Sequence, residues 1–314
     1  MTSPAEVFMT VATFAAAARD GFALPQPGCG RTADRFDSLR AHARRDGSLG
    51  RLVESHVDAL AIFSEAGRCP PARAALAVWA SESACNLVLR REGQGFRLKG
   101  TKRFCGGAPI VDAALVTARA QDDDPSEPVI ILVDLRQPGV VIDGSAWAAP
   151  AFTEAGICSV HFDVRLDASC VVGPPRFYTD RPGFWQGAVG IGAVWAGMGD
   201  ALIDDAKFRS NDTLASVARG EIAALRWGID AALAHAAATI DASPMATGHH
   251  LAIAARHVVG TNLTDILRLL DHETGPAPIA FDARWQQRRL ELTMSLLQSH
   301  GRRDLAAISG SFSV

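Results

Sequence analysis

The sequence lacks the patterns that would tie a protein to a membrane or to nucleic acid. No apolar run among the 314 residues reaches membrane-spanning length. The net charge is -3 and the pI is about 6.3, and the arginines are scattered rather than gathered in one run. Such a chain has no basic field to attract a phosphate backbone. We therefore expect neither a membrane nor a nucleic acid as a partner.

Cysteine is sparse and widely spaced. None of the six cysteines forms a Cys-x-x-Cys pair, so neither a zinc site nor a disulfide framework is indicated, and no metal is expected. The N-terminal segment MTSPAEVFMTVATFAAAARDG has a short apolar centre, but no positive charge precedes it and Glu6 lies inside it. We interpret it as a helix rather than an export signal, and expect a cytoplasmic protein.

What the sequence does contain is enough apolar material for a large core, with 48% hydrophobic and 21% charged residues. Its first part is helical in pattern. In SLGRLVESHVDALAIFSEAG, apolar residues recur at three- and four-residue steps from Leu49 to Phe63. We predict an N-terminal helical domain over residues 1–70.

The period then changes to that of strands. Segments such as AALAVWAS, NLVLRREGQGFRLKG, KRFCGG, DAALVTARA, PVIILVDLR, GVVIDGSA and ICSVHFDVRL are separated by turn formers. Because no helical pattern lies between them, we expect an antiparallel sheet. The prediction is a central antiparallel β-barrel or sandwich domain over residues 71–178.

Helical patterns return from Pro182. Four long periodic segments, the last one being FDARWQQRRLELTMSLLQSHGRRDLAAI, are joined by short breaks containing Pro, Gly or Asp. Long helices with short connections are typical of an antiparallel bundle. We predict a C-terminal antiparallel helix bundle over residues 179–314, and an α+β chain as a whole.

The stretch FRLKGTKRFCGGA raises a question of chemistry. It predicts a strand, a Gly-Thr-Lys turn, and a second strand that ends on Gly106 and Gly107. Paired glycines indicate either a close approach of another group to the backbone or a β-bulge without a ligand, and both interpretations stay open here.

This stretch resembles the second-strand signature of the acyl-CoA dehydrogenase-like flavoproteins. In that family a Gly-Thr-Lys segment leads to an aromatic residue, a pair of small residues and an Asp-bearing strand, as in GFRLKGTKRFCGGAPIVDAALVTAR. The order of helical, β and helical parts agrees with the family over nearly the whole chain. The resemblance identifies the chain as a short, divergent member.

The resemblance implies a flavin, FAD, lying against the β domain. The residues at matching positions are Trp79, Ser81, Phe104, Cys105, Gly106 and Gly107, with Arg209 in KFRSND at the place of a family arginine that reaches the neighbouring subunit's pyrophosphate. The chain departs from the family where WASESACNLVLRR omits a phosphate-wrapping segment, and where HETGPAP keeps only Gly275 of a Gly-Gly loop.

The family's catalytic glutamate is missing. Neither the C-terminal segment RRDLAAISGSFSV nor the start of the bundle, which offers Trp185 and Gln186, supplies one. The resemblance then implies an FAD-dependent oxidoreductase acting on an acyl thioester or another small organic substrate without the usual base. The alternatives are a flavin monooxygenase-like enzyme that uses His300, and a non-catalytic relative that serves as an assembly or partner-binding module.

Three residues have competing structural interpretations. His300 is either a proton-handling residue or a helical histidine bonded to a backbone carbonyl, and His56 is more simply a core residue than part of a substrate cavity. Cys105 is expected to serve in packing rather than as a reactive thiol. The glycine-rich segment AVGIGAVWAGMGDAL and the family pattern predict a homodimer or homotetramer through the C-terminal helices.

Overall fold

The computed structural model describes residues 9–81, 86–120, 128–246, 248–299 and 301–310. Its internal contacts divide the chain into two compact units. The first unit comprises residues 1–24 and 51–184, and the second comprises residues 25–50 and 185–314. The division into domains 1–70, 71–178 and 179–314 stays a prediction, and the two units are described separately below.

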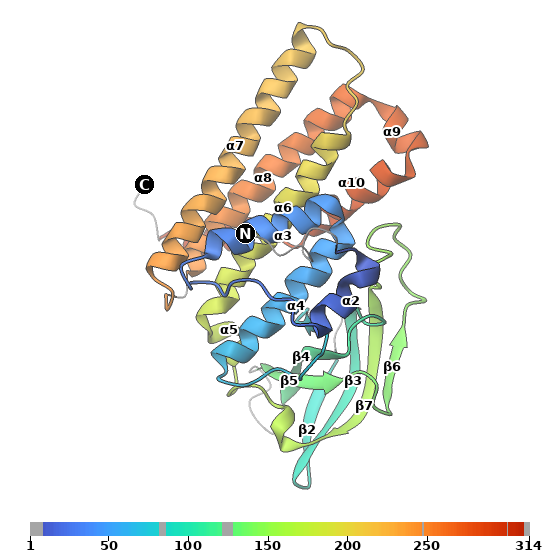
Figure 1. The fold of residues 1–314 in the computed structure, drawn as a ribbon, viewed down its shortest axis with the longest axis vertical. Helices are drawn as coiled ribbons and strands as arrows, with labels where there is room; N and C mark the ends of the chain where they lie inside the picture. The colour runs from blue at the N-terminus through green and yellow to red at the C-terminus, as the bar shows by residue number, and fades with distance from the viewer. Residues whose placement is uncertain (1–8, 82–85, 121–127, 247, 300, 311–314) are drawn as a thin grey trace. The chain divides into compact units, whose positions relative to one another are not determined.

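The first unit combines helices with a seven-stranded sheet (Figure 1). Its helical elements are α2 (Val11–Arg19), α4 (Gly47–Glu65) from residue 51 onward, the 3₁₀ turn η1 (Ala168–Cys170), α5 (Phe177–Asp180) and the start of α6 (Pro182–Asp205). Its strands are β1 (Leu76–Trp79), β2 (Val88–Glu92), β3 (Gly95–Cys105), β4 (Ala113–Ala120), β5 (Pro128–Asp134), β6 (Val140–Asp143) and β7 (Cys158–Leu166).

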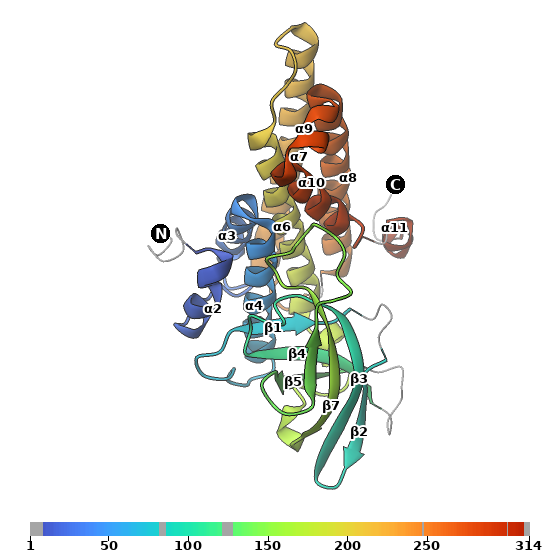
Figure 2. The ribbon, with the colours of Figure 1, turned by 90° about the vertical axis from the view of Figure 1, so that its right-hand side faces the viewer.

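The sheet is mixed, which corrects the prediction of an antiparallel one. Its strand order is β1-β4-β2-β3-β7-β6, with β5 on the other edge of β4, and β4 runs parallel to both β1 and β2. The sheet curls, so that β4 and β5 cross the direction of β3 and β7 (Figure 2). The parallel pairing of β1 with β4 is possible because the β2–β3 hairpin serves as the crossover between them, and no helix is needed there.

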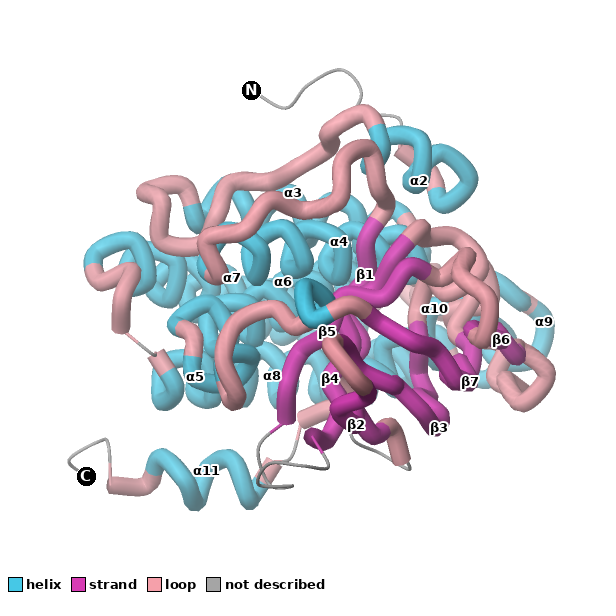
Figure 3. Tube along the Cα trace, turned by 90° about the horizontal axis from the view of Figure 1, so that it is seen from below, coloured by secondary structure: helices cyan, strands magenta, loops and turns pink. Residues whose placement is uncertain are grey.

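The predicted Gly-Thr-Lys turn is also wrong, because these residues lie inside the continuous strand β3. Gly100 has φ +130°, and a Cβ atom there would collide with the carbonyl oxygen of Asn86. The glycine therefore permits a close backbone approach within the sheet rather than a reversal of the chain. Strand β3 continues past it, paired with β7 (Figure 3).

The core of the first unit lies between helix α4 and the sheet. The predicted periodic helix is confirmed as α4, which presents Ala59, Ile62 and Phe63 to a buried cluster. Strand residues complete this cluster: Leu76, Ala113, Leu115 and Ile130, with Val172 beyond β7. Fully burying a side chain such as Phe63 or Ile62 contributes about 1.5–3 kcal/mol, so this contact stabilises the sheet that carries the candidate site.

The second unit is helical. It contains α3 (Thr32–Arg45), residues 185–205 of α6, α7 (Thr213–Ala242), α8 (His249–Thr274), α9 (Pro276–Phe281), α10 (Ala283–Leu296) and α11 (Arg302–Ile308). Helices α6, α7, α8 and α10 run in alternating directions (Figure 1). The predicted last helix is interrupted: α10 ends at Leu296 and α11 begins at Arg302, after Gly301 with φ +53°.

The glycines of α6 are used inside this unit. A Cβ atom at Gly197 would collide with the carbonyl oxygen of Arg40 on α3, and one at Gly199 would collide with Leu263 on α8. These glycines let neighbouring helices of the same chain approach closely. The sequence analysis used these glycines to predict an interface with a second copy of the chain. Because Gly197 and Gly199 contact helices of the same chain, they do not support that interface.

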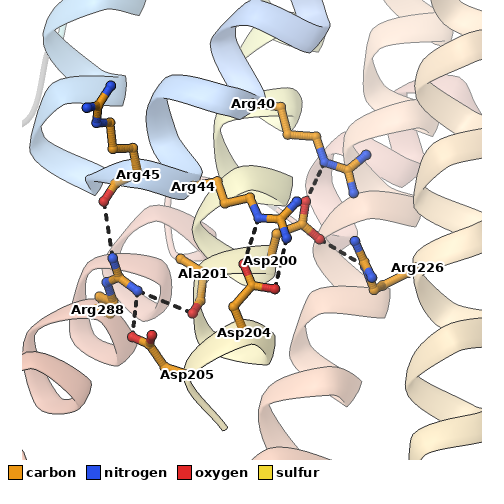
Figure 4. Close-up of polar contacts among 9 residues, drawn as sticks. All are labelled: Arg40, Arg44, Arg45, Asp200, Ala201, Asp204, Asp205, Arg226 and Arg288. Atoms are coloured by element: carbon orange, nitrogen blue, oxygen red, sulfur yellow. Dashed lines mark hydrogen bonds and ion pairs between the residues drawn. The ribbon is translucent and has the colours of Figure 1, made fainter. Parts of the chain in front are cut away.

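Ion pairs join α6 to three other helices of the second unit: α3, α7 and, through Arg288 and Asp205, α10 (Figure 4). Asp200 on α6 is 3% exposed, and its two carboxylate oxygens lie 2.7 Å from Arg40 Nε and 2.9 Å from Arg226 Nε. One turn further along α6, Asp204 accepts two hydrogen bonds from Arg44, at 2.7 and 2.9 Å. Helices α3 and α7 are thus attached to α6 through one buried carboxylate.

Candidate functional site

A β-bulge distorts the end of β3. Lys102 pairs with Val160 and Cys105 with Cys158, so two residues of β3, Arg103 and Phe104, stand opposite the single residue Ser159 of β7. Phe104 has φ +57°, a backbone region that bulky side chains avoid, and it is 54% exposed. A strained, exposed aromatic residue is typical of a functional site.

The two glycines after the bulge differ in their surroundings. Gly107 has φ +76°, and a Cβ atom there would lie 2.9 Å from Leu52 Cδ2, so its backbone and its close contact both require glycine. Gly106 lacks a positive φ, and a Cβ atom there would meet nothing within 4 Å. Open space beside Gly106 means that the fold itself does not explain why this side chain is missing.

Two tryptophans border this strand end. The indole N–H of Trp79, on β1, donates a 2.9 Å hydrogen bond to the carbonyl oxygen of Gly106. The Trp147 ring meets the Phe104 ring edge-on, with centroids 6.3 Å apart, and its own N–H donates to Ala151 O at 2.9 Å. Trp79 is 3% exposed and fixes the backbone, whereas Phe104 and Trp147 form an aromatic pair at the surface.

The opposite face of β3 is filled by packed side chains. Cys105 is buried and its thiol donates to Lys102 O at 3.3 Å, as expected for a residue that serves in packing. Lys102 is fully buried, and its ammonium donates to the carbonyl and hydroxyl oxygens of Thr117 at 3.0 and 2.7 Å. The face that remains available to a ligand is the outer one, beside Phe104 and Gly106.

The structure brings most of the predicted cofactor residues together. Phe104, Cys105, Gly106 and Gly107 lie at the end of β3 and just after it, and Trp79 at the end of β1 contacts them through its hydrogen bond to Gly106 O. Ser81 follows Trp79 by two residues and is half-buried. Glu82, which follows Ser81, lies outside the described residues. The role of these residues toward a cofactor stays a prediction.

Arg209 lies in the second unit, at the C-terminal end of α8. Its guanidinium donates to the carbonyl oxygens of His272 and Glu273, at 2.8 and 3.4 Å. Gly275, with φ +69°, packs against it, and a Cβ there would lie 3.1 Å from Arg209 Cδ. Arg209 and Gly275, which the sequence predicted separately, are thus neighbours, and Arg209 satisfies carbonyl groups that the helix end leaves unpaired.

The predicted catalytic histidine cannot be placed, because His300 lies outside the described residues. At the start of the bundle, Gln186 is buried and donates to Pro244 O at 2.8 Å, and the Trp185 ring packs on the His249 ring with centroids 4.3 Å apart. Neither residue is a carboxylate. Position 185 or 186 therefore supplies no base for removing a proton from an acyl thioester.

His56 is a core residue, as expected. Its Nε2–H donates to Phe22 O and its Nδ1 accepts from the backbone N–H of Leu76, both at 3.2 Å. Burial lowers the pKa of His56 to about 4, and the hydrogen bond to Phe22 offsets only part of that effect. A neutral imidazole with both nitrogens occupied has a structural role here.

Comparison with known proteins identifies the fold. The family model "Acyl-CoA dehydrogenase, middle domain" matches residues 80–164, which contain the β3 bulge and strands β2 to β7 up to Val164. Residues 80–164 are therefore similar to the middle domain of the acyl-CoA dehydrogenases. The predicted resemblance to this flavoprotein family is confirmed, and the signature from Gly95 to Arg119 carried it.

Solved structures share this fold over the whole chain at low sequence identity. Dibenzothiophene monooxygenase TdsC from Paenibacillus sp. A11-2 is 16% identical, with a TM-score of 0.75, covering 96% of this chain and 94% of TdsC. Methanesulfinate monooxygenase MsuC from Pseudomonas fluorescens is 16% identical, with a TM-score of 0.79 and coverages of 100% and 99%. KijD3, solved with FMN and a dTDP-linked amino sugar, is 17% identical, with a TM-score of 0.79 and coverages of 98% and 88%.

No curated protein sequence matches the chain. Such low identities establish the acyl-CoA dehydrogenase-like fold and leave the chemistry to be argued from the residues. Across the described ranges, no group of histidine, cysteine, aspartate or glutamate side chains is arranged to hold a metal ion. In the same ranges, no helix is long and apolar enough to span a bilayer.

Trp147 is a part of the site that its local sequence does not predict. Trp147 lies in GSAWAAPAF, between β6 and β7, where no alternation of apolar and polar residues marks a strand. Its partnership with Phe104 depends on how the loop folds back on β3. A lone tryptophan in a Gly- and Pro-containing loop was the available signal, and it does not identify a partner.

Proposed function

We propose that this chain is a flavin-dependent oxidoreductase of the monooxygenase-like type, with the flavin ring lying on the outer face of β3 beside Phe104 and Gly106. The observation that carries the proposal is the open space at Gly106, next to a half-exposed phenylalanine with φ +57°. A planar ring fills such space, and the backbone around a glycine is accessible to its polar edge.

The residues present fit a flavin ring. Phe104 offers an exposed aromatic face supported by Trp147, and Trp79 fixes the carbonyl of Gly106 by a hydrogen bond of 2.9 Å. The bound flavin would supply the redox chemistry. The protein's own residues would hold the ring and shape the space in which a small organic substrate meets it.

Monooxygenase-like chemistry is favoured over acyl-CoA dehydrogenation by the residues at the bundle start. Trp185 and Gln186 occupy the place where the family has a carboxylate base, and neither accepts a proton at neutral pH. TdsC and MsuC are monooxygenases of the same fold. A role for His300 as the proton-handling residue remains part of this proposal.

The flavin is either FAD, as the family resemblance implies, or FMN. KijD3 and TdsC have been solved with FMN, and XiaF from Streptomyces sp. with FADH2. The missing phosphate-wrapping segment after Ser81 removes contacts that the adenosine diphosphate part of FAD uses in the family. We therefore favour FMN or reduced flavin taken from solution over tightly retained FAD.

The direct test is a flavin titration of the purified protein. Quenching of flavin fluorescence on adding protein to FMN and to FAD gives both dissociation constants. Binding of either flavin supports the enzyme. Colourless protein that takes up neither flavin, oxidised or reduced, would instead support the alternative of a non-catalytic relative that serves as a partner-binding module.

A second test separates the two types of chemistry. If the flavin-loaded protein were a dehydrogenase, saturated acyl-CoA thioesters would bleach the flavin absorption without oxygen. We expect no bleaching, because the family's base positions carry no carboxylate. Rapid anaerobic bleaching by a simple acyl-CoA would show that another carboxylate removes the α-proton, and would overturn the monooxygenase-like assignment.

Assembly is proposed from α7 rather than from the glycines of α6. Leu214, Val217 and Trp227 on α7 are 76%, 54% and 73% exposed. Two small residues on the same face are also exposed: Ala224 lies between Val217 and Trp227 along the helix, and Ala231 follows Trp227 by one turn. Large apolar side chains beside small ones favour packing against another helix, and we assign that helix to a second copy of the chain.

A self-complementary charge pattern supports a second copy as the occupant. Glu221 and His235, both exposed, lie seven residues before and after Gly228. When two α7 helices pair antiparallel about Gly228, Glu221 of each copy lies opposite the partner's His235. The twofold axis generates this pair twice, as a closed dimer requires.

A further inference from the structure

The outer face of the sheet beside the proposed flavin position carries a carboxylate, a histidine and a hydroxyl group. Thr101 Oγ1 and His161 Nδ1 are 2.9 Å apart, and Thr101 on β3 pairs directly with His161 on β7. On β6, Val141 pairs with His161 and Asp143 pairs with Ser159. These residues point outward, because their neighbours Lys102, Val160 and Phe162 are buried.

This group is close to the aromatic pair of the candidate site. Ser159 stands opposite the bulged residues Arg103 and Phe104 on one side and opposite Asp143 on the other. The row of Phe104, Ser159 and Asp143 is therefore next to the row of Thr101, His161 and Val141. Two residues along a strand span about 7 Å, so His161 lies within reach of a small molecule bound beside Phe104.

The electrostatic environment suits a group that takes up a proton. Asp143 is ionised, because hydrogen bonds from Ser145 and, less strongly, the attraction of His161 lower the pKa of its carboxyl group. Further charged groups on this face are Arg97, Lys99 and Arg103 on β3 and Asp163 and Arg165 on β7; Asp163 is paired with Arg97, and Arg165 with Glu92. Asp163 is thus engaged by Arg97, and Asp143 is the carboxylate whose attraction acts on His161.

We infer that His161 is an acid–base residue of this site, which accepts a proton from the acidic hydroxyl or N–H group of a small aromatic substrate. This inference rests on the proposed function. Thr101 has a positioning role: by accepting a hydrogen bond from Nδ1–H, its hydroxyl leaves the lone pair of Nε2 directed away from β3.

The substrate O–H bond breaks, an N–H bond forms at Nε2 of the neutral imidazole, and the electron pair stays on the substrate oxygen. The products are a substrate anion, which is the more electron-rich and oxidisable form, and an imidazolium compensated by Asp143. Because His161 is exposed, its proton then passes to water.

The experiment uses p-nitrophenol as the probe, because its phenolate absorbs visible light and its phenol does not. Flavin content is measured first, with the flavin that the titration shows to bind. The flavin-loaded protein is then mixed with p-nitrophenol at a pH just below the probe's own pKa, and the difference spectrum is recorded. We expect the wild-type protein to convert bound probe to phenolate, lowering the pH midpoint of the bound probe.

Variants identify the residue responsible. His161→Gln is expected to keep its flavin and lose the conversion, and Thr101→Val is expected to reduce it. His272→Gln is the matched control, because His272 is an exposed histidine next to a carboxylate, Glu273, in the other unit. It is expected to behave as the wild type.

The outcomes separate the two proposals. Failure to bind any flavin contradicts the proposed function. Flavin binding without phenolate formation in the wild type, or a His161→Gln variant that converts the probe as well as the wild type, overturns the role of His161 and leaves the flavin proposal intact.

Discussion

Gly106 and Gly107 are neighbours with different constraints. Gly107 has a φ of +76°, and a Cβ atom there would clash with Leu52 and lie tightly against Val111. Gly106 has neither constraint. The sequence offered a ligand and a β-bulge as alternative reasons for the pair. The structure contains the bulge, but at Arg103 and Phe104, and it gives no packing reason for the missing side chain of Gly106, which we propose to make room for a flavin ring.

Gly107→Val is expected to destabilise the first unit. A left-handed backbone costs a non-glycine residue about 1–2 kcal/mol, and the clash with Leu52 adds to that cost. The thermal midpoint of the first unit should fall, as followed by the circular dichroism of the sheet. An unchanged midpoint would mean that this segment relaxes without cost.

His56 predicts a pH dependence of stability. Its pKa falls from 6.5 in the unfolded chain to about 4 in the folded one, so between these values the unfolded state binds the extra proton. Stability is therefore full above the unfolded value and declines as the pH falls toward 4, by about 3 kcal/mol in all. Above pH 7 this residue contributes no pH dependence.

The measurement is urea unfolding at several values of pH from 7 to 4. His56→Gln keeps a donor and an acceptor but does not titrate. Between pH 7 and 4, the free energy of unfolding of this variant should therefore decrease less than that of the wild type. Equal losses in the two proteins would show that His56 does not titrate as its burial predicts.

At the scale of elements, Asp200 on α6 fixes two other helices. It is buried and paired with Arg40 and Arg226 (Figure 4), and its replacement removes the carboxylate that faces Arg226 and leaves Arg40 with Asp230 alone. Asp200→Asn should lower the free energy of unfolding of the second unit by about 3 kcal/mol, the lower end of the range for broken buried ion pairs, since Arg226 is partly exposed.

Asp34→Asn is the matched control for this variant. Asp34 pairs with Arg31 on an exposed surface, at 2.8 Å, and such pairs contribute about 0–1 kcal/mol. Chemical unfolding followed by the far-ultraviolet circular dichroism of the helices compares the two. A loss no larger for Asp200→Asn than for Asp34→Asn would contradict the view that Asp200 holds α3 and α7 in place.

Elements were predictable where the pattern was local. The strand pattern in NLVLRREGQGFRLKG predicted the strand residues of β2 and β3, and the spacing from Leu49 to Phe63 predicted α4. The parallel pairing of β1 with β4 was not predictable, because it depends on contacts far apart in sequence. Gly100 was misjudged as a turn residue, since a glycine needed for close approach inside a sheet looks the same in sequence.

The candidate site was predictable only in part for a similar reason. The family signature located Phe104, Gly106 and Gly107, but Trp147 and His161 come from segments whose positions are fixed by strand register. No local pattern marks either residue. His300, which the sequence also indicated, lies outside the described residues, and its role stays a prediction.

At the scale of the whole molecule, the exposed face of α7 predicts self-association. Trp227→Glu should shift the protein from dimer to monomer in light scattering at micromolar concentration, because it places a charge in the centre of the apolar face. Met245→Glu is the control, since Met245 is 80% exposed but lies in the loop after α7. A monomeric wild type, or an unchanged assembly in Trp227→Glu, would contradict the α7 interface.

The central claim is that a flavin ring occupies the space beside Gly106. It is tested most directly by measuring flavin affinity and thermal midpoint on the same samples of wild type and Gly106→Val. A branched side chain fits the backbone of Gly106, which lacks a positive φ, but would fill the ring's place. The account predicts an unchanged midpoint and a loss of at least tenfold in affinity for FMN or FAD. Wild-type affinity together with a wild-type midpoint in Gly106→Val would contradict it.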